Sequence, residues 1–388
     1  MQSLGIKAPV GSYTGYGEWA RELIIGLDKL GLNISLEILD ENMYNSSKDS
    51  LPENVVEVIE RVKKPIPRNG PVFTIGTPIQ YSSNPNHFNV GTGLFEALRI
   101  PQAWLIEMSK MDLIVTSSEF NRELFIRHGI NKKKIIIIPP AVDSKRFHPT
   151  VKPFYVHTVH PFTILYLGQL ILRKGWDKLL IATLKEFNKN DDVCIILKLP
   201  PVRYDEQTTA MINKIKEVKQ VAGSSKVKIY FNNFAIPIEK VPRVYQIPNQ
   251  IMRKHLYPYL NGSTPRGVFA LPSLGEGIGL IYLEAMASGL LTIGTNITGN
   301  SFLNGQNALI VESGKPKRDL RLEMESTLYR GAPFPFVSVD AIRGALRKAY
   351  DMNETERRKI INVARKEAEN FTYEKTCTAL ITAIQSHL

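Results

Sequence analysis

The stretch GVFALPSLGEGIGLIYLEAMASGLLTIGT, residues 267–295, decides the fold prediction. It reads as an apolar strand, a loop with three glycines, and a helix that begins near Leu280. Unpaired N–H groups at a helix start favour an anion, and glycines let that anion approach the main chain. Glu276 in the loop and Glu284 in the helix add two carboxylates, which are good acceptors for sugar hydroxyls. This is the chemistry of a nucleotide-sugar pocket, and an ordinary strand-to-helix turn with two surface glutamates is the plain alternative.

Strands, turns and helices alternate on both sides of this stretch. An apolar strand at residues 3–10 precedes helical spacing at 17–31, and the segment at 162–170 starts the same rhythm again. Between them, residues 143–161 hold three prolines and no periodicity, which is typical of a linker. Continuous apolar strands that alternate with helices predict an α/β protein. We expect two Rossmann-like, doubly wound parallel sheets that face a central cleft.

The composition is that of an ordinary globular protein, with 388 residues of which 43% are hydrophobic and 22% charged. Lysine and arginine outnumber aspartate and glutamate by 49 to 37, a formal charge of +12. This surplus indicates a nucleic acid, an acidic membrane surface or a phosphorylated small molecule as partner. Since the sequence has no nucleic-acid-binding motif, we expect no nucleic-acid partner. The start has no apolar signal segment and no window is long enough to span a membrane, which predicts a cytoplasmic protein.

No metal site and no cofactor are predicted. Cys194 and Cys377 are too few for a disulfide framework or a four-ligand zinc site, and we expect two reduced thiols. The sequence lacks a D-x-D triplet, the carboxylate motif that holds a metal on a sugar diphosphate, and Asp191-Asp192 reads as a solvated turn. The G-x-G-x-G spacing differs from the dinucleotide fingerprint, which argues against NAD. We therefore expect metal-independent chemistry.

Four segments together resemble a known family. Residues 276–289 resemble the E-x7-E signature of the retaining, GT-B-fold glycosyltransferases of the GT4 type. LGQLILRKGWDKLL at 167–180 resembles the first strand, loop and helix of that family's donor domain, and residues 111–149 resemble the end of its N-terminal domain. GTGLFEALRIPQAW at 91–104 is similar to a mannosyltransferase-like subgroup. The segments occur in the family's order and reach across most of the chain.

The resemblance implies a GT-B fold and a transferase activity. Residues 1–150 are then an acceptor domain, 151–370 a donor domain, and 371–388 a C-terminal helix that crosses back to the N-terminal domain. The implied reaction moves a hexose from a nucleoside-diphosphate sugar to a hydroxyl of a glycan or lipid-linked acceptor, with retention through same-face attack. An epimerase or hydrolase of the same fold, and a non-catalytic sugar- or nucleotide-binding module, are the alternatives.

Arg173 and Lys174 are candidates for stabilising the leaving group. Negative charge grows on the bridging oxygen as a sugar departs, and cations beside that oxygen stabilise the transition state more than the ground state. A cation at a helix start also opposes the helix dipole, which favours a functional reason for it. Solvated surface charges are the alternative. The resemblance departs at Gln169, where the family often has an arginine.

The resemblance also implies how the donor is held. Glu276 bonds hydroxyls of the donor sugar, and Glu284 bonds the ribose of the nucleotide. Amides at the start of the predicted helix hold the sugar and diphosphate, and the glycine-rich loop at 11–17 faces the phosphates from the other domain. A plain turn is the alternative for that loop. The predicted donor-binding residues are Gly277, Ile278, Gly279, Leu280, Glu284, Gly15 and Gly17.

The first half of the chain is expected to receive the acceptor. Glu96, in the subgroup segment, is the polar candidate near the reaction centre, with a surface role as the alternative. His87 is a weaker candidate, because a lone loop histidine is more often structural or solvated. The basic amphipathic helix and lysine run at 117–134 can dock on an anionic membrane, or its apolar face can pack on the sheet. The predicted catalytic set is Arg173, Lys174, Glu276 and Glu96.

Overall fold

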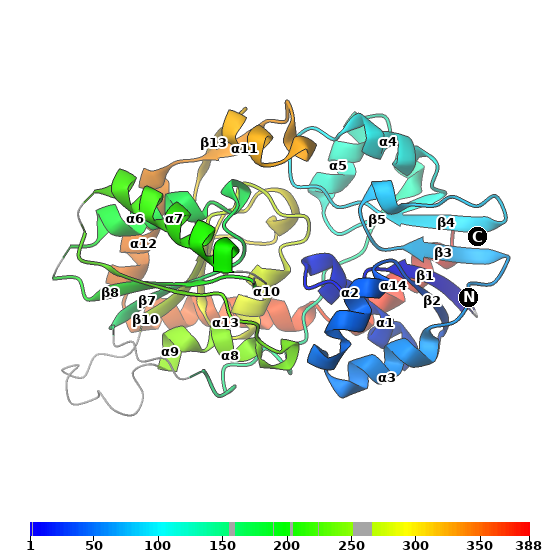
Figure 1. Ribbon diagram of the computed structural model, residues 1–388, viewed down its shortest axis with the longest axis horizontal. Coiled ribbons are helices and arrows are strands. Elements are labelled where there is room, and N and C mark those ends of the chain that lie inside the picture. The colour runs from blue at the N-terminus through cyan, green and yellow to red at the C-terminus, as the bar shows by residue number, and fades with distance from the viewer. Residues whose placement is uncertain (2, 155–159, 189, 202–204, 224, 251–265) are drawn as a thin grey trace. The chain divides into compact units, whose positions relative to one another are not determined.

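Two compact units make up the chain in the computed structural model (Figure 1). The structure describes residues 1, 3–154, 160–188, 190–201, 205–223, 225–250 and 266–388. The first unit comprises Met1–Val142, Pro237–Glu239 and Phe371–Leu388, and the second comprises Asp143–Ile236 and Lys240–Asn370. The second unit begins where the predicted linker begins, and residues 155–159 of that linker lie outside the described residues.

The first unit is built on a six-stranded sheet with the order β2-β1-β3-β4-β5-β6. Every neighbouring pair is parallel. The strands are β1 (Ser3–Ala8), β2 (Asn33–Ile38), β3 (Gly70–Thr74), β4 (His87–Thr92), β5 (Leu113–Thr116) and β6 (Ile135–Ile137). The helices are α1 (Gly15–Lys29), α2 (Glu41–Ser47), α3 (Glu53–Val62), α4 (Gln102–Ser109), α5 (Glu119–Arg127) and α14 (Tyr373–Gln385), with short 3-10 turns η1 (Lys48–Ser50), η2 (Pro78–Gln80) and η3 (Lys132–Lys134).

The C-terminal helix α14 belongs to the first unit and packs against α1 (Figure 1). Gly26 of α1 provides the room, since a Cβ there would lie 2.6 Å from the sulfur of Cys377. The backbone N–H of Val142 donates to the carbonyl of Phe371 at 2.9 Å, just before α14 begins. The hydroxyl of Thr372 caps the helix by accepting the N–H of Lys375. The first unit is therefore completed by a helix from the C-terminal end of the chain, which packs against a helix from its beginning.

The second unit has a six-stranded parallel sheet with the order β12-β11-β10-β7-β8-β9. Its strands are β7 (Phe162–Leu167), β8 (Val193–Lys198), β9 (Lys228–Asn232), β10 (Arg266–Leu271), β11 (Leu291–Gly294) and β12 (Leu309–Ile310), and an antiparallel pair is formed by β13 (Ser313–Lys317) and β14 (Phe334–Val337). The helices are α6 (Trp176–Glu186), α7 (Asp205–Ala222), α8 (Pro242–Tyr245), α9 (Ile247–Gln250), α10 (Leu280–Ala287), α11 (Leu320–Glu325), α12 (Val339–Asp351) and α13 (Glu354–Asn370). The 3-10 turns are η4 (Leu172–Lys174), η5 (Ile238–Lys240, which spans the two units), η7 (Thr298–Asn300) and η8 (Thr327–Tyr329).

The predicted α/β fold with two doubly wound parallel sheets is confirmed. Strands β7, β8 and β10 are continuous apolar runs because helices cover both faces of the sheet. The chain winds outward from β7 through β8 to β9, and then continues on the other side of β7 with β10. The strand order therefore reverses between β7 and β10, and ligands of such sheets bind outside the carboxyl ends of the strands at this point.

One strand lies where the sequence reads as a loop. β4 (His87–Thr92) begins at His87, which the sequence predicted to lie in a loop. The structure buries Asn89 and satisfies it. Its amide donates to the carbonyl of Asn84 at 3.0 Å and to Asp112 at 3.2 Å. A paired polar residue thus replaces an apolar one inside the sheet.

Candidate active site

The carboxyl ends of β7 and β10 bring together residues that are far apart in sequence. The turn η4 (Leu172–Lys174) follows β7, and the glycine-rich loop with Glu276 follows β10. The two strands are neighbours in the sheet, with Val268 opposite Ile164. This is the point where the strand order reverses, so the predicted site residues of the second unit lie at the expected edge.

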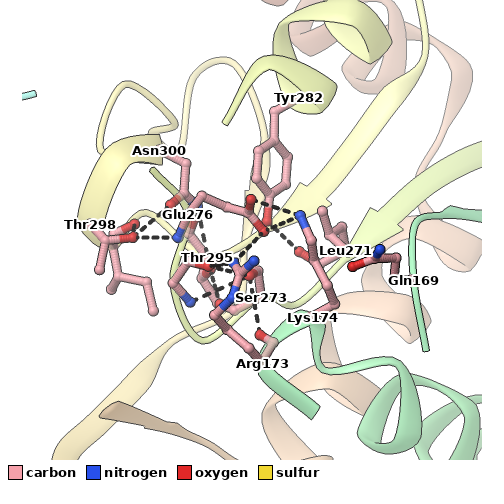
Figure 2. A network of polar contacts seen from close by, with 12 residues as sticks. Gln169, Arg173, Lys174, Leu271, Ser273, Glu276, Tyr282, Thr295, Thr298 and Asn300 are labelled. Carbon is pink, nitrogen blue, oxygen red and sulfur yellow. Dashed lines mark hydrogen bonds and ion pairs between the residues drawn. The ribbon is translucent and has the colours of Figure 1, made fainter. Parts of the chain in front are cut away.

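Lys174 and Glu276 form a close ion pair (Figure 2). The Nζ atom of Lys174 lies 2.8 and 2.7 Å from the two carboxylate oxygens of Glu276. Glu276 is 7% exposed, so the pair is largely withdrawn from water. The two residues were expected to bind different groups of one ligand. Instead, the two residues neutralise each other in this structure. A ligand that binds Lys174 must compete with Glu276, and a ligand that binds Glu276 must compete with Lys174.

Arg173 is also buried, at 8% exposure. Its guanidinium donates to the carbonyl of Gly275 and lies 3.6 Å from the carboxylate of Glu276. The alternative of a solvated surface charge is therefore wrong for Arg173. Gln169, where the resemblance departs, is exposed and its carbonyl accepts the hydroxyl of Tyr166 at 2.6 Å. Two cations thus flank one carboxylate at the ends of β7 and β10.

The carboxylate of Glu276 is held ionised by its neighbours. Burial alone would raise the pKa of Glu276, because a charged group loses hydration. The positive charges of Lys174 and Arg173 outweigh this effect and lower the pKa below the usual value of a glutamate. Glu276 is therefore an anion at neutral pH and can accept hydrogen bonds.

The turn η4 is held from two sides. Toward β10, the N–H of Leu274 donates to the carbonyl of Arg173 at 2.7 Å. On the other side, the carboxylate of Glu325 on α11 accepts the N–H of Leu172 at 2.8 Å. Between them, Gly175 has φ +67 and lies so close to β10 that a Cβ would be 2.2 Å from the carbonyl oxygen of Pro272. Only glycine fits this position, which fixes where Lys174 leaves the main chain.

Replacing Gly175 by alanine should destabilise the protein more than the same change at Gly223. Both glycines have a left-handed backbone, which costs alanine about 1 kcal/mol. A Cβ at Gly223 meets nothing within 4 Å, whereas at Gly175 it collides with the main chain. Chemical denaturation of Gly175→Ala should therefore show a loss in unfolding free energy clearly larger than that of Gly223→Ala. Equal losses would contradict the close approach.

The second predicted glutamate, Glu284, lies one turn into α10. Its carboxylate accepts the hydroxyl of Tyr245 at 2.5 Å, and the ring of Tyr245 is fully buried. The helix begins after Gly279, whose φ of +79 lets the chain turn from the loop into the helix. Gly277 and Leu280, at the start of the helix, are partly exposed. These residues form one continuous segment with Glu276.

Sequence reasoning missed the turn that follows β11. The decisive stretch of the sequence ends at residue 295 and does not reach η7 (Thr298–Asn300). In the structure, the N–H of Glu276 donates to the hydroxyl oxygen of Thr298 at 2.8 Å (Figure 2). The N–H of Gly299 donates to the carbonyl of Glu276 at 2.8 Å. The signal that could have found this turn is the Thr-Gly-Asn triplet a few residues after an apolar strand, a sequence typical of turns.

Lys198 is a second residue that sequence reasoning missed. It ends β8 at the same edge of the sheet, opposite Leu167 of β7. Its Nζ donates to the carbonyls of Leu199 at 2.6 Å and Phe234 at 2.9 Å. Burial lowers the pKa of Lys198 to about 8. The only available signal was a lysine at the end of an apolar run.

Three predicted residues lie in the first unit. Gly15 and Gly17 were expected in a loop, but α1 already begins at Gly15, so both lie in its first turn. Glu96 lies in the segment after β4 and is partly exposed. The hydroxyl of Tyr16 donates to the carbonyl of Leu94 at 3.4 Å, so the structure brings these two segments together at the carboxyl edge of the first sheet. The roles assigned to these three residues stay predictions.

The structure gives His87 a structural partner. His87 is the first residue of β4, whereas Glu96 follows the last residue of that strand, so the two lie at opposite edges of the sheet. The Nε2 atom of His87 is 3.0 Å from the carbonyl oxygen of Pro67. Its position thus fits the structural alternative, and a catalytic role for His87 stays a prediction.

The basic segment at 117–134 uses its apolar face inside the protein. Leu124 and Phe125 of α5 are buried, so the apolar face packs on the sheet, which was the alternative to membrane docking. Arg127, Lys132 and Lys133 are exposed. No helix among the described residues is both long and apolar enough to cross a membrane. Across the same residues, no three histidine, cysteine or carboxylate side chains gather as metal ligands would.

Comparison with known proteins finds a family match inside the second unit. Residues 242–324, which include Glu276 and Glu284, match the family described as Glycosyl transferases group 1. Mannosylfructose-phosphate synthase of Agrobacterium fabrum is 26% identical over 229 residues, or 57% of this chain and 46% of that protein. A probable sucrose-phosphate synthase of Thermosipho melanesiensis is 26% identical over 217 residues, or 54% and 44%. The chain thus spans about half the length of these curated relatives. The mannosyltransferase-like subgroup stays a prediction.

Solved structures match the fold over the whole chain. Anabaena HepE in complex with UDP and glucose has a TM-score of 0.64 at 12% identity, with all of both chains covered. Sucrose-phosphate synthase of Thermosynechococcus elongatus has a TM-score of 0.62 at 15% identity, over 100% of this chain and 99% of that one. The chain therefore has the GT-B fold of these solved structures, and its segment at residues 242–324 is similar to the family Glycosyl transferases group 1.

Proposed function

We propose that the chain is a retaining glycosyltransferase that moves a hexose from a nucleoside-diphosphate sugar to a hydroxyl of a glycan or lipid-linked acceptor, without a metal. The observation that carries the proposal is the buried cluster of Lys174, Arg173 and Glu276 where the strand order reverses. Two cations suit a diphosphate, and a carboxylate suits sugar hydroxyls. The names of the relatives, which are synthases and transferases, point the same way.

In the proposed reaction, the bond between the anomeric carbon and the bridging oxygen breaks, and its electron pair stays on the diphosphate. Lys174 and Arg173 stabilise this charge, which is larger in the transition state than in the donor. The acceptor hydroxyl attacks the same face of the sugar, and its proton passes to the leaving diphosphate. Glu276 orients the donor through sugar hydroxyls, and Glu284, oriented by Tyr245, bonds the ribose.

A panel of nucleotide sugars, incubated with and without acceptors, tests this proposal. UDP-sugars come first, because the solved HepE structures hold UDP, UDP-glucose or UDP with glucose. Acceptor-dependent release of nucleoside diphosphate supports a transferase. A changed sugar without transfer, or release without acceptor, would instead support the epimerase or hydrolase. Binding without any turnover would support the non-catalytic module.

The acceptor class needs a broad panel because the relatives differ in it. Two relatives are named as sugar-phosphate synthases, one as a phosphatidylinositol N-acetylglucosaminyltransferase subunit and one as a capsular polysaccharide glycosyltransferase. The panel should therefore hold sugar phosphates, lipid-linked acceptors and glycans. Peripheral contact with an anionic membrane remains part of the proposal, carried by the charges of Arg127, Lys132 and Lys133 rather than by the buried side of α5.

Turnover should be unaffected by removal of divalent ions. Arg173 and Lys174 supply the positive charge that Mg²⁺ supplies in other sugar-diphosphate sites, so EDTA should leave the rate of diphosphate release within about twofold of the untreated rate. The measurement is the initial rate after dialysis against EDTA, with and without added Mg²⁺. Loss of activity on chelation, restored by Mg²⁺, would contradict the proposed role of the two cations.

A further inference from the structure

The backbone of Thr298 has an unusual conformation. Its φ is +59, and it is the one non-glycine residue with positive φ in the part of the chain that the structure describes. Threonine is β-branched, so this left-handed region is strained for it. Thr298 is 4% exposed, so the surrounding residues enforce the conformation. Strain of this kind persists where the local structure requires it, and it gathers at functional sites.

The contacts of Thr298 explain what the conformation achieves. The hydroxyl of Thr298 donates to the carbonyl of Ile297 at 2.6 Å, which leaves a lone pair directed at the N–H of Glu276, 2.8 Å away. The next residue, Gly299, donates its own N–H to the carbonyl of Glu276 at 2.8 Å. Two successive residues, Thr298 and Gly299, therefore hold both polar groups of the Glu276 backbone.

Gly299 allows the two segments to approach. A Cβ on Gly299 would lie 2.2 Å from the carbonyl oxygen of Gly277 and 2.6 Å from that of Glu276. With the positive φ of Thr298, its hydroxyl contacts the N–H of Glu276 and the next N–H contacts the carbonyl of the same residue. The strained conformation and the double contact thus belong together.

We propose that Thr298 is a positioning residue for the Glu276 carboxylate, and that its strained backbone serves to place the hydroxyl on the Glu276 N–H. The backbone of Glu276 is held by Thr298 and Gly299, and its side-chain carboxylate contacts Lys174. A shift of this backbone would misplace the carboxylate, and misplacement by about 1 Å can cost about 100-fold in rate. The proposal rests on the proposed function of Glu276.

Three substitutions separate the hydroxyl from the shape of the side chain. Thr298→Val keeps the β-branch and removes the hydroxyl, and we expect kcat to fall by about 10- to 100-fold with a smaller change in KM. Thr298→Ser keeps the hydroxyl and should retain kcat within about threefold. Thr298→Gly relieves the strain but also lacks the hydroxyl, so its kcat should fall as that of the valine variant does.

Thr183→Val is the matched control. Thr183 is a fully buried threonine of the same unit, on α6, and its hydroxyl donates to the carbonyl of Leu179 at 2.8 Å. Its loss should lower the melting temperature without lowering kcat. The proposal would be overturned if Thr298→Val and Thr183→Val lowered the melting temperature equally and neither lowered kcat. Thr298 would then be an ordinary structural residue.

Hydrogen exchange provides a readout that does not depend on turnover. The Glu276 amide should exchange at least about tenfold faster in Thr298→Val than in the wild type, and at the wild-type rate in Thr298→Ser, because the valine variant, unlike the serine variant, leaves that N–H without its acceptor. If exchange changes in this way while the wild type shows no transfer to any acceptor, the proposed function fails and the positioning contact stands. Unchanged exchange in the valine variant, or inactivity of the serine variant, would overturn the positioning role.

Discussion

Replacing Lys174 by alanine should lower kcat/KM for the nucleotide sugar by a factor of about 10²–10³. The ammonium group is already in place at the ends of β7 and β10, held within 2.8 Å of both oxygens of Glu276. A charge that is fixed before the reaction stabilises the departing diphosphate without reorganisation. The measurement is the initial rate of diphosphate release over a range of donor concentrations, at saturating acceptor. Both kcat and kcat/KM should fall, because the charge is needed most in the transition state.

The same substitution should also cost stability. It leaves the buried carboxylate of Glu276 with Arg173 as its nearest remaining cation, at 3.6 Å. Breaking a buried pair costs about 3–5 kcal/mol, and we expect a value near the lower end because Arg173 remains. The double variant Lys174→Met, Glu276→Gln removes both charges and should recover part of this loss while it stays inactive. Loss of activity is then separated from loss of folding.

Lys185 provides the control for charge alone. It lies exposed on α6, the helix that follows Lys174, so Lys185→Ala changes net charge equally without touching the cluster. Its rates should stay within about twofold of wild type, as expected for a solvated surface charge. A folded Lys174→Ala variant with the rates of Lys185→Ala would end the proposed role of Lys174 in stabilising the leaving group.

Much of the fold could be predicted from the sequence because its core strands are apolar on both faces. β7 and β10 are runs of buried residues, and the glycine at 279 marks the start of α10, so the strand, loop and helix of the decisive stretch were readable. The β13–β14 pair was not readable. Its first strand, SGKPK at Ser313–Lys317, is mostly exposed and charged, and it lacks the apolar alternation that indicates a strand.

The sequence named Lys174 and Glu276 as candidate site residues but did not predict that they pair with each other. Lys174 and Glu276 are 102 residues apart, and each was given its own part of a ligand. That they bond each other depends on the adjacency of β7 and β10, which no local pattern encodes. Thr298 was hidden for the opposite reason. Its local preference argues against a left-handed backbone, and only the contact with Glu276 explains the conformation.

Replacing Glu276 by glutamine should have opposite effects on binding and on turnover. The carboxylate now neutralises Lys174, so a diphosphate that approaches the ammonium must compete with it. Glutamine keeps the shape and removes the negative charge. We therefore expect UDP to bind about tenfold more tightly, which corresponds to about 1.4 kcal/mol. Turnover should nevertheless fall by about 100-fold, because a neutral amide orients the sugar hydroxyls and balances the two cations less well.

Calorimetric titration with UDP isolates the charge effect, since UDP lacks the donor hexose whose hydroxyls would contact residue 276. The comparison is Glu186→Gln, which removes a partly buried carboxylate of the same unit that pairs with Arg343 at 3.1 Å and Arg347 at 2.8 Å. Glu186 lies at the end of α6, and its loss should lower stability without changing UDP affinity. Because the neighbouring cations lower the pKa of Glu276, the gain in affinity should be constant from about pH 6 to 8. Weaker UDP binding in Glu276→Gln would mean that the carboxylate supports the diphosphate site, and the competition between ligand and ion pair would be refuted.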